Sequence, residues 1–255
     1  YPERKFWLVA DSAYTNSSLI RNRPSNVTIF GRGRHDAILY APAPKRKPGQ
    51  MGRPRVRGKR LASPGQRAAS KNAQWKRVRV FAYGKSALVR VLVIDALWYA
   101  AAHSELIRLV VVRGFPGHER DDVFVCTDTS VNARDVIETY ARRWSLEVTF
   151  HEAKGKLGFE EPQNRSARAV KRTAPMALFA YSLVVAWYAR IGYRSRFAKT
   201  PSLPWYTEKP TVTFSDMLAT IRRASWAERL LDPAASARDL RKRIRPLVEY
   251  VSAAA

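Results

Sequence analysis

YARRWSLEVTFHEAK, residues 140–154, places four polar side chains on one stripe of a predicted helix. At roughly 100° per residue they project to about 0°, 300°, 340° and 320°; in order they are Tyr140, Arg143, Glu147 and Lys154. Apolar residues flank this stripe on both sides: Leu146, Phe150 and Leu157 on one, and Ile137, Trp144 and Val148 on the other. A helix that is apolar on both flanks is expected to be largely buried, so the stripe must open into a site or pair internally.

The chemistry of the stripe favours a site that handles phosphate. A carboxylate such as Glu147 is a ligand that hard divalent cations prefer. The side chains of Arg143 and Lys154 suit phosphate groups. Together they indicate phosphoryl-transfer chemistry on a nucleic acid. The alternative is an internal ion-pair network that serves only the fold.

The spacing Y-x2-R-x3-E-x6-K resembles the signature of DDE transposases from bacterial insertion sequences. The likeness extends to residues 126–170, to FWLVADSAYTN at residues 6–16, to GRPR at 52–55 and to PWYTEKPTVTFSDML at 204–218. The resemblance implies an α/β fold with a ribonuclease-H-like core that is incomplete at its N-terminus. It also implies a basic, β-rich insertion that interrupts this core and a helical C-terminal region.

Asp11 follows the apolar run of residues 6–10. Such a run is typical of a buried parallel strand, and a carboxylate at its carboxyl end is a usual site position. The resemblance implies that Asp11 is the second catalytic aspartate and Glu147 the last of three metal-binding carboxylates. The first aspartate would lie upstream of Tyr1, so we expect a truncated copy or one piece of a split gene, inactive in isolation. The alternative for Asp11 is a turn residue or the N-cap of a helix over residues 17–23.

The resemblance also implies the ligands of the chain. Two Mg²⁺ or Mn²⁺ ions would be held by Asp11 and Glu147, and the DNA-binding residues near them would be Tyr140, Arg143, Lys154 and Lys156. The DNA would be double-stranded, both transposon ends and target, in a synaptic complex formed by a homodimer. The activity would be strand cleavage and strand transfer. The alternatives are a catalytically inactive remnant and a basic nucleic-acid-binding protein without chemistry.

The composition agrees with a polyanionic partner. Lys and Arg number 46 against 21 Asp and Glu, giving a net charge of +25, which favours association with nucleic acid. A hydrophobic content of 46% with seven Trp excludes a disordered basic tail. The single cysteine, Cys126, cannot form an internal disulfide or a zinc cluster, which predicts a reducing compartment. The apolar run of residues 174–189 is short for a membrane span and predicts a buried helix.

The chain is predicted to divide into five segments. Residues 1–40 form the second half of the ribonuclease-H-like sheet, 41–74 a basic flexible arm and 75–128 the β-rich insertion. Residues 129–195 form the catalytic and packing helices, and 196–255 the helical C-terminal region. The arm supplies further predicted DNA contacts, namely Arg53, Arg55, Arg57, Lys59 and Arg60. Its GRPR sequence resembles an AT-hook core for a minor groove, although non-specific phosphate contact is the simpler interpretation.

Four strand-like runs between residues 75 and 128 predict an antiparallel meander, the last of which could instead join the main sheet. Trp98 and Tyr99 are expected to pack in a core, with stacking on an unpaired base as the alternative. Asp128 is expected to organise a loop or cap a helix rather than to bind metal. Asp122 has no strand-end or helix-start context of comparable quality, so no role is predicted for it. Amphipathic helices are predicted over residues 214–223 and 234–251, after a connecting segment that contains Trp205 and Tyr206.

Overall fold

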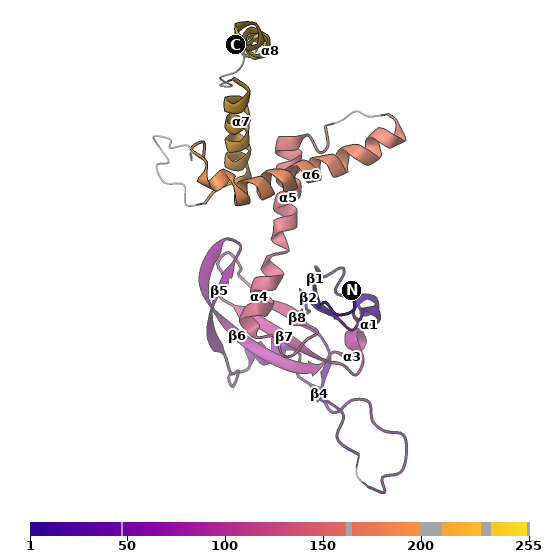
Figure 1. The fold of residues 1–255 in the computed structure, drawn as a ribbon. Helices are drawn as coiled ribbons and strands as arrows, with labels where there is room; N and C mark the ends of the chain where they lie inside the picture. Colours follow the sequence, from indigo (N-terminus) through magenta and orange to yellow (C-terminus); the bar gives the residue numbers. More distant parts are fainter. Residues whose placement is uncertain (47, 162–164, 199–210, 231–235, 254–255) are drawn as a thin grey trace. The chain divides into compact units, whose positions relative to one another are not determined.

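The computed structural model describes residues 1–46, 48–161, 165–198, 211–230 and 236–253. Trp205 and Tyr206 lie outside these ranges. The chain divides into two compact units, Tyr1–Ser145 and Leu146–Ala255. The first unit is mixed α/β and is built on a mostly antiparallel sheet, which is compatible with a ribonuclease-H-like domain (Figure 1). The second unit contains helices.

The sheet of the first unit has eight strands: β1 (Phe6–Val9), β2 (Val27–Arg32), β3 (Leu39–Tyr40), β4 (Arg60–Leu61), β5 (Lys76–Ala82), β6 (Lys85–Leu97), β7 (Leu106–Arg113) and β8 (Asp122–Cys126). Their order is β1-β2-β8-β7-β6-β3-β4, with β5 also paired to β6. Among the strand pairs that the structure describes, only β1 and β2 run parallel. The prediction that β1 is buried is wrong, because β1 lies at the edge of the sheet and Phe6, Trp7 and Leu8 are exposed. Strands β5 to β8 form the predicted meander, and β8 pairs with β2 through Phe30 opposite Cys126. Residues 1–40 and 75–128 therefore share one sheet.

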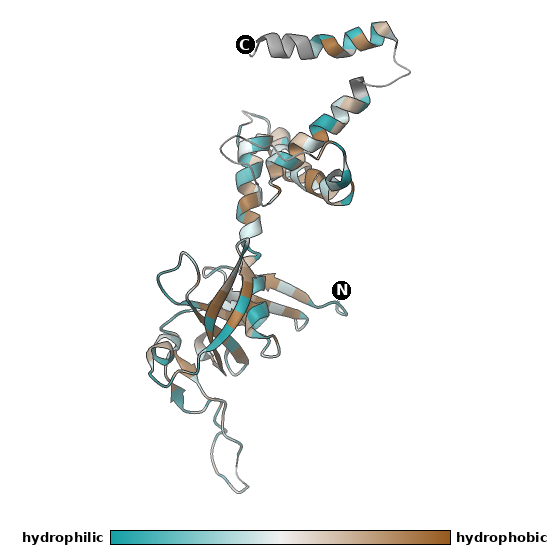
Figure 2. Ribbon diagram, turned by 90° about the vertical axis from the view of Figure 1, so that its left-hand side faces the viewer, coloured by the Kyte–Doolittle hydropathy of each residue, from teal (hydrophilic) through white to brown (hydrophobic). Residues whose placement is uncertain are grey.

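Both faces of the sheet carry apolar cores, because side chains alternate along each strand. On one face, Val89 and Val110 pack beneath Val136 and Ile137 of α4 (Ala133–Ala141). On the other face, Ile94 and Leu109 pack with α1 (Ser17–Asn22), α2 (Pro64–Ala69) and α3 (Tyr99–Ala102). Figure 2 shows the hydrophobic stretches along these strands in brown. Trp98 belongs to the second core, as predicted.

The flexible arm is shorter than predicted. Residues 60–69 form β4 and α2, and Ala68 is buried in the core, so the boundary at residue 74 is wrong. The physical reason is a capping box in which the Ser63 hydroxyl accepts the Gln66 N–H, while the Gln66 side chain accepts the Ser63 N–H. The remaining loop, described at residues 42–46 and 48–57, projects from the sheet (Figures 1 and 2).

The helix predicted across residues 140–154 is interrupted, so the prediction of one continuous helix is wrong. α4 ends at Ala141, Arg142 and Arg143 form a turn, and α5 (Trp144–Leu157) begins. In the turn, the Arg143 N–H donates to the Tyr140 carbonyl at 3.0 Å. The Ser145 hydroxyl donates to the Arg142 carbonyl at 2.7 Å. In this turn, hydrogen bonds to the carbonyl three residues earlier, one of them from a side-chain hydroxyl, replace the regular main-chain hydrogen bonds of an α-helix.

The expectation of a largely buried helix around Glu147 is also wrong. Trp144, Leu146 and Val148 are exposed, and Ala153 is the one α5 residue that the structure shows as buried. Of the six flanking residues, only Ile137, which belongs to α4, is buried, so the apolar flanks do not form a buried face on α5.

The second unit contains most of α5, α6 (Ala167–Arg190), the short 3-10 helix η1 (Gly192–Arg194), α7 (Phe214–Leu230) and α8 (Ala237–Ala253). The prediction of a buried helix over residues 174–189 is wrong in its burial, because Met176, Phe179 and Leu183 of α6 are exposed in the described part of the chain. α6 and α7 pack through Tyr181 and Phe214, whose rings stack at 4.5 Å between centroids. The Asp216 carboxylate accepts the Thr213 N–H at the start of α7, which is consistent with an N-terminal cap. Among the described residues, no helix is both long and apolar enough to span a membrane.

Candidate nucleic-acid interface

Asp11 lies in a tight turn directly after β1. The Ala10 N–H donates to the Phe30 carbonyl, so the ladder with β2 continues to the residue before Asp11. One carboxylate oxygen of Asp11, Oδ1, accepts the N–H groups of Ala13 at 2.9 Å and Tyr14 at 3.3 Å. The helix N-cap is Asn16, not Asp11. The structure thus places Asp11 at the carboxyl end of an edge strand as a turn-forming residue, with Oδ2 outside the described hydrogen bonds.

A cavity of about 420 Å³ lies at the same end of the sheet, where β2 ends. Its lining combines cations with aromatic rings and includes Arg32, Lys85, Arg143, Tyr83, Phe115, His118, Tyr140 and Trp144. These residues come from β2, the β5–β6 turn and the start of β6, the β7–β8 loop, the C-terminal end of α4, and the turn and first residue of α5 that follow it. Guanidinium groups bind phosphate, and aromatic faces stack on bases. The cavity therefore has the chemistry of a nucleotide-binding site.

Tyr140 and Arg143, which the sequence places on one stripe, remain neighbours across the helix break. The Tyr140 side chain is buried, and its ring lies 4.8 Å from the ring of Phe124. The Arg143 guanidinium lies 5.8 Å from the centre of the Tyr140 ring, within range of a cation–π interaction. Tyr140 thus anchors α4 to β8 and offers a surface against which Arg143 is held.

Tyr83 enters the cavity from a strained turn. It has a positive φ of 52°, followed by Gly84 at 76°, as in a two-residue hairpin turn between β5 and β6. The ring packs edge-on against Phe115 at 5.5 Å and Trp144 at 6.0 Å. Burial raises the pKa of the Tyr83 phenol. A bulky residue in this conformation is uncommon, and strain of this kind clusters at functional sites.

Asp122 contacts two residues that line the cavity, Arg32 and His118. Its buried carboxylate lies 2.5 Å from the Arg32 guanidinium and 2.5 Å from Nδ1 of His118. Sequence reasoning assigned Asp122 no role because no local pattern marks it. Arg32, Tyr83 and His118 were missed for the same reason, although the Tyr83–Gly84 pair between two strand-like runs signals the hairpin turn.

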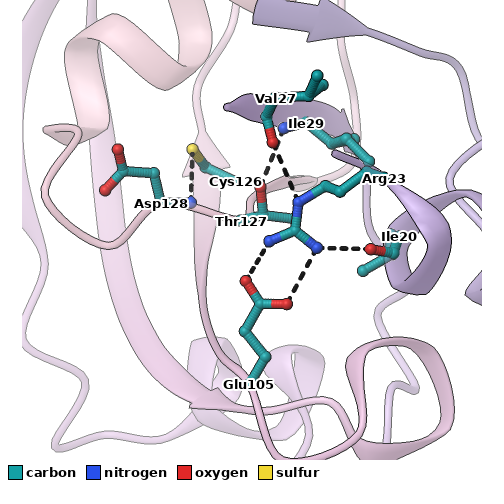
Figure 3. Close-up of polar contacts among 8 residues, drawn as sticks. All are labelled: Ile20, Arg23, Val27, Ile29, Glu105, Cys126, Thr127 and Asp128. Carbon is teal, nitrogen blue, oxygen red and sulfur yellow. Dashed lines mark hydrogen bonds and ion pairs between the residues drawn. The ribbon is translucent and has the colours of Figure 1, made fainter. Parts of the chain in front are cut away.

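Asp128 lies at the opposite end of the sheet from Asp11, because β8 runs antiparallel to β2. Figure 3 shows it just after Cys126 and Thr127. Its Oδ1 accepts the Ser130 N–H at 2.8 Å and the Ser130 hydroxyl at 2.6 Å, which lowers the pKa of the carboxyl group. The prediction that Asp128 organises a loop is therefore confirmed.

Arg23 connects several secondary-structure elements at the end of the sheet where Asp128 lies. Its guanidinium pairs with Glu105 and donates to the carbonyls of Ile20 and Val27 (Figure 3). These partners come from α1, β2 and the segment before β7, so Arg23 serves the fold.

Glu147, Lys154 and Lys156 belong to the second unit. Glu147 lies in the first turn of α5, and the two lysines lie in its last turn. Glu147 and Lys154 are seven residues apart, about two turns, and so share one side of this helix. The ammonium group of Lys154 lies 2.5 Å from Glu160, and both side chains are about half exposed. An exposed pair of this kind is weak and is readily exchanged for another anion.

The predicted DNA-binding residues of the arm fall into two groups. Arg53 and Arg55 lie in the projecting loop and are exposed. Arg57 instead stacks between two rings, 4.3 Å from the centre of Tyr40 and 4.8 Å from that of Tyr99. The stem is closed by hydrogen bonds between Ala41 and residues 58 and 59, with Arg60 in β4. Arg57 therefore anchors the loop.

In the described ranges, no three His, Cys, Asp or Glu side chains come together as a metal site. Asp11 offers one hard oxygen ligand of the kind that Mg²⁺ prefers. A complete ligand set is not formed by the residues that the structure describes.

Comparison with known families bears on the first unit. Residues 3–93 match a family model described as DDE superfamily endonuclease. The match begins before β1 and ends within β6, so it includes Asp11 and the basic loop but none of residues 140–154. It is thus independent of the helix pattern that carried the resemblance to DDE transposases. No curated protein matches the chain.

Proposed function

We propose that the chain is a DDE-type transposase component that binds duplex DNA and takes part in metal-dependent strand cleavage and strand transfer. The observation that carries the proposal is the position of Asp11. It follows β1 within the segment similar to DDE endonucleases, at the end of the sheet where the basic, aromatic cavity opens. Open α/β sheets commonly bind ligands at the carboxyl ends of their parallel strands.

The cavity residues would hold the DNA. Arg143 and Lys85 bind backbone phosphates, and Arg32 contributes less because Asp122 already neutralises part of its charge. Tyr83 and Trp144 offer ring faces to an unstacked base. Tyr140 positions Arg143, which it holds against its ring.

Asp11 and Glu147 are the proposed ligands of Mg²⁺ or Mn²⁺. When bound, such ions activate the attacking oxygen and stabilise the leaving oxygen of a phosphodiester. In the same proposal, Lys154 and Lys156 contact phosphate beside Glu147, and two copies of the protein act on paired DNA ends.

Thermal unfolding with and without Mn²⁺ tests the metal ligands apart from activity. Mn²⁺ should raise the melting temperature of the wild type, since a ligand that binds only the folded state stabilises it. The rise should vanish in Asp11→Asn and in Glu147→Gln. Asp128→Asn is the matched control, because this carboxylate lies at the other end of the sheet and should leave the rise unchanged.

The same proteins should be assayed for duplex binding and for nicking of supercoiled plasmid. Duplex binding without any response to the ion in the wild type would indicate a nucleic-acid-binding protein without chemistry. A response that survives both substitutions would show that the metal ligands lie elsewhere.

A further inference from the structure

The β5–β6 hairpin has an outer face that neither core covers. Along β5 the exposed residues alternate as Arg77, Arg79 and Phe81, and across from them on β6 lie Arg90, Leu88 and Ser86. The inner face of the same hairpin carries Val80 and Val89 and packs against α4. The outer face is therefore a separate surface, and its residues lie outside the lining of the cavity.

Like charges face each other on this surface. Arg77 pairs directly with Arg90, and Arg90 pairs in turn with Arg113 of β7. Arginines directly opposite each other in a sheet repel and destabilise the pairing. Arg113 is compensated, because it forms an ion pair with Asp121 and stacks on Trp75. For Arg77, Arg79 and Arg90, no ion pair is found with any residue that the structure describes.

The sequence of the hairpin offers these arginines no local counter-charge. Residues 76–90, KRVRVFAYGKSALVR, contain five cations and no Asp or Glu. Apolar groups lie among the guanidiniums: Phe81 is 59% exposed and Leu88 is 56% exposed. A cationic face with exposed apolar groups and no acid of its own is best satisfied by an external polyanion.

We infer that the outer face of the β5–β6 hairpin is a second DNA-binding surface, which grips the phosphate backbone of a duplex through Arg77, Arg79 and Arg90. Arg77 and Arg79 are two residues apart on one strand, about 6.6 Å, and Arg90 lies directly across from Arg77. The three residues thus form a compact triangle on the sheet, from which their guanidinium groups can bind neighbouring phosphates bidentately. Phosphate neutralises the repulsion within the Arg77–Arg90 pair. The inference rests on the proposed function for the identity of the partner as DNA.

Fluorescence anisotropy with a labelled duplex, measured on the full chain between about 50 and 200 mM salt, tests this surface. The variant is Arg77→Gln/Arg79→Gln/Arg90→Gln. The control removes the same charge from exposed residues of α6, as Arg168→Gln/Lys171→Gln/Arg172→Gln. Each lost phosphate contact should lower the slope of log affinity against log salt by about 0.9, so the hairpin variant should lose about 2–3 units of slope. The control should lose less than about one unit.

Thermal melting of the free protein separates this role from a structural one. Because the substitutions remove repulsion between opposed arginines, the hairpin variant should melt at the wild-type temperature or above it. A hairpin variant that keeps the wild-type slope, or a control that loses as much, overturns the inference. Anionic vesicles that bind through the same arginines, with duplex binding unchanged, would overturn it in favour of a lipid surface. If the wild type binds no duplex at all, the proposed function fails as well; if it binds and only the variant prediction fails, the proposed function stands.

Discussion

Thr15 fills the space that a side chain on Gly31 would require. A Cβ at residue 31 would overlap the Thr15 hydroxyl and come within 2.6 Å of its methyl carbon. The same hydroxyl donates to the main-chain carbonyl of Asp11 at 2.6 Å. Because Gly31 has no side chain, Thr15 fits against β2, where its hydroxyl stabilises the turn that contains Asp11.

Gly31→Ala should therefore destabilise the protein by about 1–3 kcal/mol, as expected for overpacking. Because Thr15→Ala removes the overlapping atoms, the double variant should be less destabilised than the sum of the two single changes. Urea unfolding of all four proteins gives this coupling. Gly155→Ala is the control: no atom lies within 4 Å of the position that its Cβ would take, and it is inside α5, so it should be neutral or stabilising. Strict additivity would contradict the proposed overlap.

The Tyr140 ring should matter more to stability than its hydroxyl group. Tyr140→Ala empties a buried site against Phe124 and should cost about 3–5 kcal/mol in the free energy of unfolding. Tyr140→Phe keeps the ring under Arg143 and should cost less than about 1.5 kcal/mol. Urea unfolding measures both. A loss from Tyr140→Phe as large as that from Tyr140→Ala would mean that the hydroxyl, not the ring, holds α4 in place.

Glu138 should make the first unit sensitive to acid. Its Oε1 accepts the Phe81 N–H at 2.8 Å and an Arg134 N–H at 2.9 Å, and these bonds lower the pKa of the carboxyl group below its usual value. A lowered folded-state pKa contributes stability above the unfolded-state pKa, and that stability is lost as the pH falls through the folded-state value. The unfolding free energy of the wild type should therefore decrease as the pH is lowered below about 4.5.

In Glu138→Gln this part of the acid sensitivity should disappear, because the amide does not ionise. Glu119→Gln, at an exposed position, is the control and should retain the wild-type pH profile. The check is the unfolding free energy from urea titrations at a series of pH values. Equal acid sensitivity in Glu138→Gln and the wild type would assign the effect to other carboxylates.

Substitutions in the loop between residues 42 and 57 should distinguish the arginine that anchors the loop from the arginines that bind DNA. Arg57→Gln loses two ring contacts, each about 0.5–1 kcal/mol at exposed sites, and should lower the melting temperature. Arg53→Gln/Arg55→Gln should leave the melting temperature unchanged and lower the salt slope of duplex binding by about 2 units. The measurements are thermal melting and anisotropy.

The Arg53→Gln/Arg55→Gln variant also tests the AT-hook interpretation. A loss confined to AT-rich duplexes would support insertion of the GRPR sequence into a minor groove. Equal losses on all duplexes would leave only non-specific phosphate contact.

Much of the fold is determined by local patterns in the sequence. Alternating runs such as residues 77–83 predict the strands of the meander, and the apolar run before Asp11 predicts β1. The excess of Lys and Arg by itself indicates a polyanionic partner. These features depend on residues close together in the chain or on composition alone, and short-range propensity and periodicity are sufficient to predict the strands.

Only the tertiary structure decides the break at Arg142–Arg143, the cavity and the opposition of Arg77 to Arg90. Helical periodicity carries through residues 140–154, and a turn closed by the Ser145 hydroxyl interrupts it without a Pro or Gly to mark the site. The cavity joins Arg32, Tyr83 and His118 with α4, and the register between strands sets which arginines meet. Such contacts cannot be predicted from local sequence patterns, because they arise from pairing and packing between segments that are distant in the chain.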